Sequence, residues 1–269
     1  MIRLRLAVLL AMLVAAIPAQ AAQCGGDFQS FIASFSREAA AKGISGNVMS
    51  AALGGVTEDP AVLAFDRRQH ATFNKTFEQY VSTRVGPGRI RTGVLMMQRY
   101  GSLLSRIEQQ YGVPAEVLVA IWGLESDFGA GDMGKLPVFR VLATLAHDCR
   151  RSELFQGELM SALQIVQRGD LSVPDMIGAY AGEIGQTQFL PSSYIKYGVD
   201  FDGNGRVDLR RSVPDVLAST ANLLKSNGWQ AGGSYEEGSA NFEAMHEWNR
   251  AVIYRKTIAY FADRLVQGH

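Results

Sequence analysis

Apolar residues recur three or four positions apart along most of this chain, and stretches that alternate apolar with polar residues are scarce. The first spacing is typical of amphipathic helices and the second of β-strands. The sequence therefore predicts a mainly α protein with little β structure. The expected helices cover residues 28–43, 46–53, 89–111, 114–128, 139–147, 152–168, 173–180, 191–197, 213–227 and 251–266.

Three stretches fit the helical pattern less well. Residues 57–77 include Pro60, and we expect an extended segment that turns helical near its end. Residues 85–88 read Val-Gly-Pro-Gly, which is typical of a turn. Residues 230–241 are rich in Gly, Ser and Glu, so we expect little regular structure there. With 269 residues, of which 47% are hydrophobic, the chain is long enough to bury a sizeable core.

The N-terminus has the layout of a secretory signal peptide. Two arginines precede an apolar run over residues 6–17, and a cleavage pattern of small residues, Ala-Gln-Ala, ends at Ala21. The run is short for a membrane span, and a retained membrane anchor is the alternative. We expect residues 1–22 to be a signal peptide, with cleavage after Ala21 or Ala22, and the mature protein to be periplasmic.

The chain has two cysteines, Cys24 and Cys149. In an exported protein a single pair is suited to a disulfide, which here would tie the mature N-terminus to the middle of the chain. Two free thiols are the alternative, because the sequence does not give the distance between them. Gln23 argues against a lipid anchor on Cys24, because bacterial lipidation usually requires a small residue at that position.

Other functional classes find little support in the composition. Basic and acidic residues both number 26, so the basic excess typical of nucleic-acid binding is missing. The histidines do not have the paired spacing of a catalytic metal site. The Gly-x-Ser-x-Gly motif of nucleophilic hydrolases does not occur either. The four scattered histidines are His70, His147, His246 and His269.

One acidic residue lies where a helix would bury it. In the helix expected over residues 114–128, Val117, Ile121 and Leu124 form one apolar stripe, and Glu125 follows four residues after Ile121. Burial raises the pKa of a carboxyl group, so that it can donate a proton near neutral pH. A glycosidic oxygen needs such a donor before it leaves. A glutamate at the edge of the stripe, paired with an arginine, is the alternative.

Several segments in order carry a resemblance to a known family. They are YGVPAEVLVAIWGLESDFG over 111–129, LATLAHDCRR from Leu142, ELMSAL from Glu158, AGEIGQTQFLPSSY over 181–194, VDFDGNG over 199–205 and NLLKSNGW ending at Trp229. They resemble lytic murein transglycosylases of the membrane-bound transglycosylase B type, glycoside hydrolase family 103. The resemblance implies a catalytic domain over residues 23–269. It would have a lysozyme-like α core at about 111–229 and a helical lobe from 24–110 and 242–269.

The resemblance also implies a reaction on the glycan strands of peptidoglycan. Glu125 occupies the position of the family's catalytic glutamate in a deep groove. It would protonate the oxygen of the MurNAc–GlcNAc bond and then, as a base, accept the proton of the muramyl C6 hydroxyl. That hydroxyl attacks C1 and leaves a 1,6-anhydromuramyl end. Because no water is consumed, no second catalytic carboxylate is required, unlike in most glycosidases, and no cofactor is needed.

Two side chains match groove residues of the family. Gln188 matches a glutamine that is expected to hydrogen-bond sugar, although an amide bonded to loop backbone is the alternative. Tyr80 is in frame with a groove tyrosine, and a phenol ring offers a flat apolar face to a sugar. Core packing of Tyr80 is the alternative. Both assignments rest on the resemblance.

Further groove residues are predicted from their position in the segment over 181–194. Gly182 and Gly185 would let the backbone approach the glycan closely, because glycine has no side chain. Gln186 and Glu183 lie near the groove by sequence only. Glu183 is also a second candidate for the catalytic acid, although its expected loop setting suits that role less well than the helix of Glu125.

The chain departs from the family at several groove positions. The family's groove serine is Ala179 here, and a family tyrosine is Leu223. The C-terminal Tyr-Asn pair of the family appears as Trp248 and Asn249, and we expect Trp248 to contact the substrate. Each change would alter affinity or the preferred glycan without removing the acid.

Residues 200–205, Asp-Phe-Asp-Gly-Asn-Gly, resemble the start of an EF-hand calcium loop. The twelfth position, which is glutamate in a standard loop, is Arg211 and cannot bind a cation. A structural calcium ion is one interpretation, and a metal-free turn held by Asp and Asn side chains is the other. The candidate ligands are Asp200, Asp202, Asn204 and Asp215, with Asp208 as a further candidate.

Two other functions remain open at this point. A muramidase that uses water would share the fold and the glutamate, and would leave a reducing end instead of an anhydro end. A catalytically silent peptidoglycan-binding protein is the second alternative, although the intact GLESDFG segment argues against it. The sequence does not identify partners in cell-wall synthesis or secretion.

Overall fold

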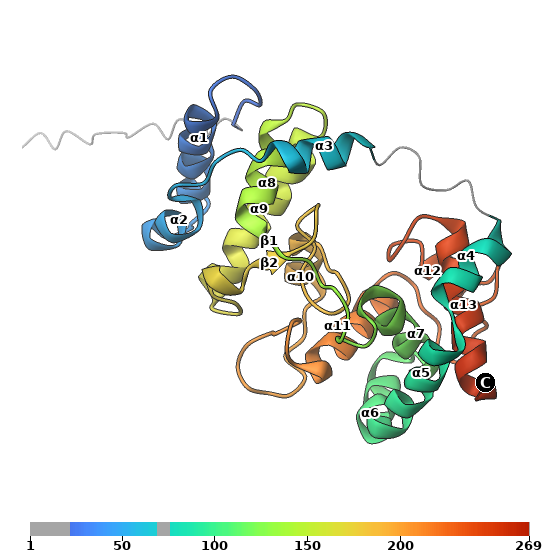
Figure 1. Cartoon of the computed structure of the whole chain (residues 1–269). Helices are drawn as coiled ribbons and strands as arrows, with labels where there is room; N and C mark the ends of the chain where they lie inside the picture. Colours follow the sequence, from blue (N-terminus) through green and yellow to red (C-terminus); the bar gives the residue numbers. More distant parts are fainter. Residues whose placement is uncertain (1–21, 69–75, 269) are drawn as a thin grey trace, which may run out of the picture.

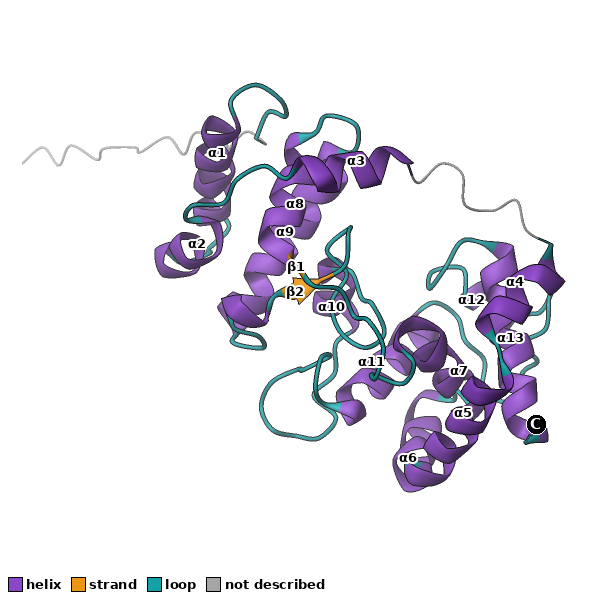
Figure 2. Cartoon of the chain, viewed as in Figure 1, coloured by secondary structure: helices purple, strands orange, loops and turns teal. Residues whose placement is uncertain are grey.

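The computed structural model describes residues 22–68 and 76–268, and these residues are predominantly helical (Figures 1 and 2). The mainly α prediction is therefore confirmed. The expected signal peptide lies outside the described residues, apart from Ala22. No described helix is long and apolar enough to cross a membrane. The helices are α1 (Phe28–Ala41), α2 (Gly46–Leu53), α3 (Pro60–Arg68), α4 (Phe77–Arg84), α5 (Pro87–Arg99), α6 (Gly101–Tyr111), α7 (Ala115–Ser126), α8 (Val138–His147), α9 (Ser152–Arg168), α10 (Pro191–Tyr197), α11 (Val213–Ser226), α12 (Ala240–Ala244) and α13 (Val252–Gln267).

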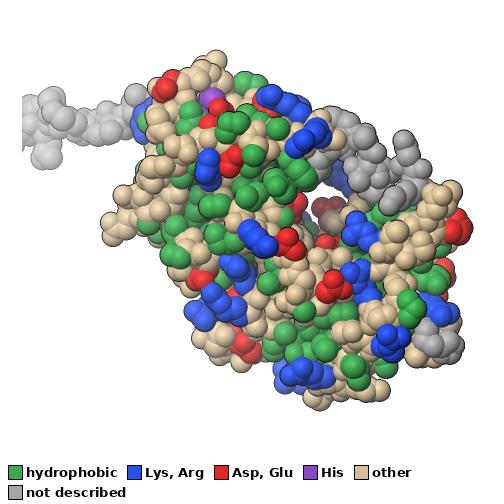
Figure 3. Space-filling model, in the orientation of Figure 1, with side chains coloured by type: hydrophobic (Ala, Val, Ile, Leu, Met, Phe, Trp, Pro, Cys, Tyr) green, Lys and Arg blue, Asp and Glu red, His purple; other side chains and the backbone are tan. Residues whose placement is uncertain are grey.

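The helices form two packed groups (Figure 1). In one group α1, α2 and α3 lie against α8 and α9, and in the other α5, α6 and α13 pack on α7 while α4 packs on α13. α10 packs on α9, α11 packs on α6 and α7, and α10 and α11 contact each other. These two helices therefore connect the groups. The space between the groups is where a cleft can form, and Figure 3 shows a hollow there.

The segment 24–110 of the predicted helical lobe is divided between the two groups of helices. Helices α1–α3 pack on α8 and α9, whereas α5 and α6 pack on α7 and α4 packs on α13. Ionic contacts explain the placement of α3: the buried Asp66 pairs with both Arg150 and Arg151, which follow α8. The core boundary at about 111–229 stays a prediction.

The segment over residues 57–77 is more helical than predicted. α3 begins at Pro60, and Oδ1 of Asp59 accepts hydrogen bonds from the backbone N–H groups of Ala61 and Val62. An acidic side chain followed by proline is a helix start, because proline has no N–H to leave unsatisfied in the first turn. α4 then begins after Thr76, which forms a capping box with Gln79.

Two predicted helices are wrong in part. The helix expected over 89–111 is broken at Tyr100 into α5 and α6, and the Tyr100 ring packs edge to face on Trp122 at 5.8 Å between centroids. The helix expected over 173–180 is a short 3-10 turn, Val173–Asp175, followed by strand β2 (Ile177–Gly178). β2 pairs antiparallel with β1 (Leu136–Pro137), which satisfies its backbone groups in place of helical bonds.

The predicted disulfide between Cys24 and Cys149 is confirmed, with the two Cα atoms 5.2 Å apart. Beside it, the backbone N–H of Gly25 donates to the carbonyl oxygen of His147 at 2.9 Å. The N-terminal segment is therefore held to the end of α8 by a covalent bond and a hydrogen bond.

Replacing both cysteines by serine should lower the free energy of unfolding by about 3–5 kcal/mol. The cross-link joins residues 125 positions apart, and its removal returns the entropy of that long loop to the unfolded chain. Urea denaturation of the oxidised protein and the double variant measures the difference. In a reductant, the urea midpoint of wild type should fall to that of the variant. The prediction is contradicted if neither reduction nor the double substitution changes the midpoint.

Candidate active site

Glu125 lies in the last turn of α7, where the helix meets the cleft. Residues 117–124 are all buried, whereas the Glu125 side chain is partly exposed. The chain turns sharply after the helix, because Asp127 and Phe128 have left-handed φ angles of 47° and 62°. The Oγ of Ser126 accepts a hydrogen bond from the N–H of Gly129 at 3.0 Å and holds this turn. The acid is thus presented from a rigid buried helix.

Two donors converge on one oxygen of this acid. The hydroxyl of Tyr254, in the first turn of α13, donates to Oε1 of Glu125 at 2.6 Å. The indole Nε1 of Trp248 donates to the same oxygen at 3.1 Å. Among the described residues, Oε2 takes no hydrogen bond, and Glu125 has no ion pair with an arginine. Oε2 is therefore available to another molecule.

Burial raises the pKa of Glu125 above its ordinary value, and the nearby charge of Glu183 raises it further. The hydrogen bonds from Tyr254 and Trp248 and the charge of Arg84 act in the opposite direction without cancelling the rise. Glu125 consequently holds its proton to higher pH than an exposed glutamate does. A carboxyl group in this state can act as a general acid.

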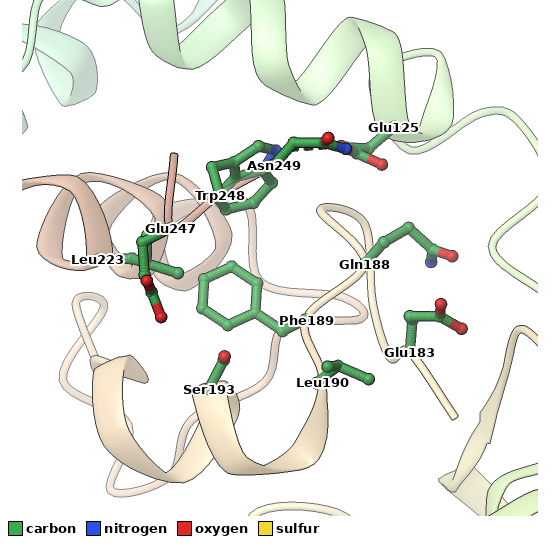
Figure 4. Close-up of a pocket in the computed structure, with 10 residues that line it drawn as sticks. All are labelled: Glu125, Glu183, Gln188, Phe189, Leu190, Ser193, Leu223, Glu247, Trp248 and Asn249. Carbon is green, nitrogen blue, oxygen red and sulfur yellow. Dashed lines mark hydrogen bonds between the residues drawn. The ribbon is translucent and has the colours of Figure 1, made fainter. Parts of the chain in front are cut away.

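The acid opens into a pocket of about 330 Å³. Figure 4 shows its walls, which come from α7, the segment over residues 183–193, α11 and the loop before α13. Acidic, amide and aromatic groups all reach it. Its lining residues are Glu125, Glu183, Gln188, Phe189, Leu190, Ser193, Leu223, Glu247, Trp248 and Asn249.

Gln188 reaches the pocket from a strained turn. Its φ angle is 53°, and its Nε2 donates to the carbonyl oxygen of Gly185 at 2.8 Å and to that of Met133 at 3.4 Å. The two interpretations of Gln188 are therefore compatible. Its amide N–H₂ is held by backbone, and its Oε1 is left to accept a hydrogen bond from a ligand.

Three neighbours of Gln188 have packing or hydrogen-bonding roles within the protein. Gln186 is buried, and its amide accepts from Nε1 of Trp122 at 2.8 Å and donates to the carbonyl of Arg210 at 3.0 Å, so it supports α7 from behind. A Cβ on Gly185 would lie 2.3 Å from the carbonyl oxygen of Leu209. A Cβ on Gly182 would lie 2.5 Å from the Leu142 side chain. Both glycines therefore permit close packing within the protein, and their approach to glycan stays a prediction.

Tyr80 lies near Glu125 without lining the pocket. It is buried on α4, with the Arg84 guanidinium 5.4 Å from its ring centroid. Burial raises the pKa of Tyr80, and the Glu125 charge adds to the rise. Glu183, the second candidate acid, does line the pocket, but its Oε2 accepts the N–H of Ala181 at 2.9 Å. Glu125 is therefore the better placed of the two acids.

The positions that depart from the family line the cleft. Leu223 and Trp248 lie in the pocket of Glu125. Ala179 and Tyr180 line a neighbouring pocket of about 300 Å³ that shares Gln188 with the first. The Tyr180 ring stacks on Phe65 of α3 with the centroids 3.8 Å apart. The two pockets are thus consecutive parts of one cleft between the two groups of helices.

Tyr254 is a hydrogen-bond partner of Glu125 that the sequence did not predict. It lies at the head of a buried stripe of α13, which continues through Ile258, Phe261 and Leu265 at spacings of four, three and four residues. By periodicity it is one more core residue. It lies 129 residues from Glu125 along the chain, so no local sequence pattern connects the two residues.

Three carboxylates of the calcium-like loop come together. Single oxygen atoms of Asp200, Asp202 and Asp215 lie within 4.8 Å of one another. Burial raises the pKa of Asp215, and the charge of Asp202 adds to the rise. Oδ1 of Asn204 accepts the N–H of Arg206 at 3.2 Å. Oδ1 of Asp208 accepts the N–H of Arg210 at 3.0 Å, and the backbone N–H of Asp208 donates to Oδ2 of Asp215 at 2.9 Å.

Comparisons with known proteins agree with this architecture. The model of the transglycosylase SLT domain matches residues 27–238. The chain is similar to membrane-bound lytic murein transglycosylase B of Escherichia coli K12, with 38% identity over 160 residues. The match covers 59% of this chain and 44% of that protein, so it spans less than half of the relative's length.

Two solved structures show the same fold. SltB3 of Pseudomonas aeruginosa, solved with NAG-anhNAM-pentapeptide, has 31% identity and a TM-score of 0.84, over 91% of this chain and 81% of that one. The Escherichia coli lytic transglycosylase Slt35, solved with calcium, has 25% identity and a TM-score of 0.77, over 94% and 99%. The predicted lysozyme-like helical fold is confirmed.

Proposed function

The chain belongs to the transglycosylase SLT domain family, and we propose that it is a lytic transglycosylase that cuts peptidoglycan with Glu125 as its acid and base. The observation that carries the proposal is the environment of Glu125. A half-buried carboxyl group with a raised pKa opens into a cleft, and one of its oxygens takes no hydrogen bond from the described residues.

The proposed reaction uses the same carboxyl group twice. Protonated Glu125 gives its proton to the glycosidic oxygen between MurNAc and GlcNAc, and the bond from that oxygen to C1 breaks. The C6 hydroxyl of the same muramyl residue attacks C1, and its proton passes to the Glu125 carboxylate. The product ends in 1,6-anhydromuramic acid, and the enzyme regains its starting state without water or a cofactor.

Several groups in the cleft suit a glycan substrate. Trp248 offers aromatic surface, and Gln188 offers an amide oxygen to a sugar hydroxyl or N–H group. Tyr80, which lies near Glu125 outside the pocket lining, would contact the substrate at the edge of the site. A relative of the same fold, SltB3, was solved with a peptidoglycan fragment, which supports glycan strands as the ligand.

The experiment that tests this function is mass spectrometry of the products released from purified murein by the mature protein. Muropeptides with 1,6-anhydromuramic acid ends are expected. Products with reducing muramic acid ends, which are one water heavier, would make the protein a hydrolytic muramidase. Binding of murein without any released product would favour the silent binding protein.

We also propose a structural calcium ion in the loop over residues 200–215. Carboxylate oxygens are the ligands that calcium prefers, and Asp200, Asp202 and Asp215 bring three of them within 4.8 Å of one another. The related Slt35 was solved with calcium, which supports this assignment. The site would stabilise the segment between α10 and α11 and take no part in the chemistry.

Calcium should raise the melting temperature of the mature protein, because an ion that binds only the folded state stabilises it. An Asp200→Asn, Asp202→Asn double variant should show no increase. Its melting temperature should equal that of wild type in chelator. Thermal melts in millimolar calcium or chelator measure this. An equal increase in both proteins would place calcium elsewhere.

For the location, we propose the periplasm, after removal of the signal peptide. Ala22 supports cleavage just before it, because it is buried, its N–H donates to Glu38 and its carbonyl accepts from Gln156 at 2.8 Å. The disulfide fits an oxidising compartment. N-terminal sequencing of the exported protein would test this.

A further inference from the structure

We propose that Trp248 is a positioning residue for the acid: with Tyr254 it holds Oε1 of Glu125, so that Oε2 is the oxygen that exchanges the proton with substrate. The inference rests on the proposed function of Glu125 and goes beyond it. It gives a second role to Trp248, which was expected only to contact the substrate.

The geometry fixes the indole from two sides. Its Nε1 donates to Oε1 of Glu125 at 3.1 Å, and its ring meets the buried Phe189 ring edge to face, with centroids 5.5 Å apart. The remaining surface of the ring lines the pocket (Figure 4). Trp248 therefore contacts Glu125, packs on the buried Phe189 ring and lines the pocket in which a ligand would bind.

Two donors on one oxygen determine which oxygen is protonated. A carboxyl group that accepts two hydrogen bonds at Oε1 keeps that oxygen as its carbonyl, so its proton resides on Oε2. Tyr254 alone would leave the carboxyl group free to rotate about that single contact. The second donor, from a different segment of the chain, fixes the plane of the group and directs Oε2 to the cleft.

The donors also favour the carboxylate that forms after proton donation. The charged and titratable groups that act on Glu125 are Tyr254 of α13, Arg84 of α4 and Glu183 of the opposite loop, and Tyr80 of α4 acts on Tyr254. Loss of the indole donor removes one of the contributions that lower the pKa of Glu125. The pKa should then rise further.

Trp248→Phe tests the inference, because it removes the N–H and keeps an aromatic ring against Phe189. On murein fragments, kcat should fall about tenfold while KM changes by less than about threefold. The alkaline limb of kcat/KM reports loss of the acid's proton and should move to higher pH. Circular dichroism and a thermal melt show that the variant is folded.

Trp229→Phe is the control. The buried Trp229 also donates through Nε1, to the carbonyl of Gly112 at 2.9 Å, but it lies outside the pocket. This variant should lose stability and keep the wild-type pH limb. A Trp248→Phe enzyme that keeps the wild-type limb, whatever its kcat, would overturn the inference and reduce Trp248 to a sugar platform.

A second measurement separates this inference from the proposed function. Carbon-13 NMR of the labelled Glu125 carboxyl group follows its titration without any substrate. A higher titration midpoint in Trp248→Phe supports the inference even if wild type releases no product, in which case only the proposed function fails. Equal midpoints in the two proteins refute the inference even if wild type is fully active.

Discussion

Replacing Glu125 by glutamine should lower the rate of glycan cleavage by a factor of roughly 10²–10⁴, the usual contribution of a general acid–base group. Glutamine has the shape of the acid and its Oε1 still accepts from Tyr254 and Trp248, but it has no proton to give to the leaving oxygen. Affinity for glycan strands should stay close to that of wild type, because the cleft is unchanged.

The same substitution should leave the protein equally stable or more stable at neutral pH. Burial raises the pKa of Glu125 in the folded state above its value of about 4.5 in the unfolded chain. The folded state therefore binds the proton more tightly, and stability is lost as the pH rises from that value through the raised folded pKa. A neutral glutamine does not ionise and avoids this loss.

Product release from murein, binding of murein strands and thermal melts at pH 4 and pH 7 measure these effects. Glu183→Gln is the control, because Glu183 lines the same pocket and was the second candidate acid. It should keep most of the activity. A Glu183→Gln protein as inactive as Glu125→Gln, or a Glu125→Gln protein that still cuts, would reassign the acid.

The sequence predicted the acid for a reason that the structure modifies. The pattern placed Glu125 on the apolar stripe of an amphipathic helix, whereas α7 is buried on all sides over residues 117–124. On such a helix nearly every position is in the core, so periodicity could not single out Glu125. The family motif around it did so. The surroundings of the acid come from α13 and the preceding loop, which no local pattern connects with α7.

Most helices could be predicted because their signals are local, and the errors arose where tertiary contacts decide. The break at Tyr100 follows from its packing on Trp122 of another helix, and the loss of helix after Asp175 follows from pairing with β1. The same holds for Gly185, whose need for a bare Cα comes from the carbonyl of Leu209. None of these partners is near in sequence.

Tyr254→Phe should reduce kcat by roughly 10- to 100-fold, the range expected for one hydrogen bond to an ionisable group. Its bond to Oε1 is short, 2.6 Å, and short bonds to a carboxylate are among the stronger ones. Burial and the charge of Glu125 raise the pKa of Tyr254, so the hydroxyl keeps its proton and remains a donor at working pH. KM should change little, because Tyr254 does not line the pocket.

The alkaline limb of kcat/KM should also move to higher pH, since the Tyr254 hydroxyl lowers the pKa of Glu125. The control is Tyr235→Phe, which removes a comparable bond from a tyrosine to Asp263 of the same helix, 2.9 Å long and remote from the pocket. It should leave the limb in place. Because Tyr254 and Trp248 together hold Oε1, loss of either donor already frees the carboxyl group to rotate. The double variant with Trp248→Phe should therefore lose less than the product of the two single losses. If the loss of kcat in the double variant equals the product of the two single losses, the two donors act on Glu125 independently. That result would contradict the prediction.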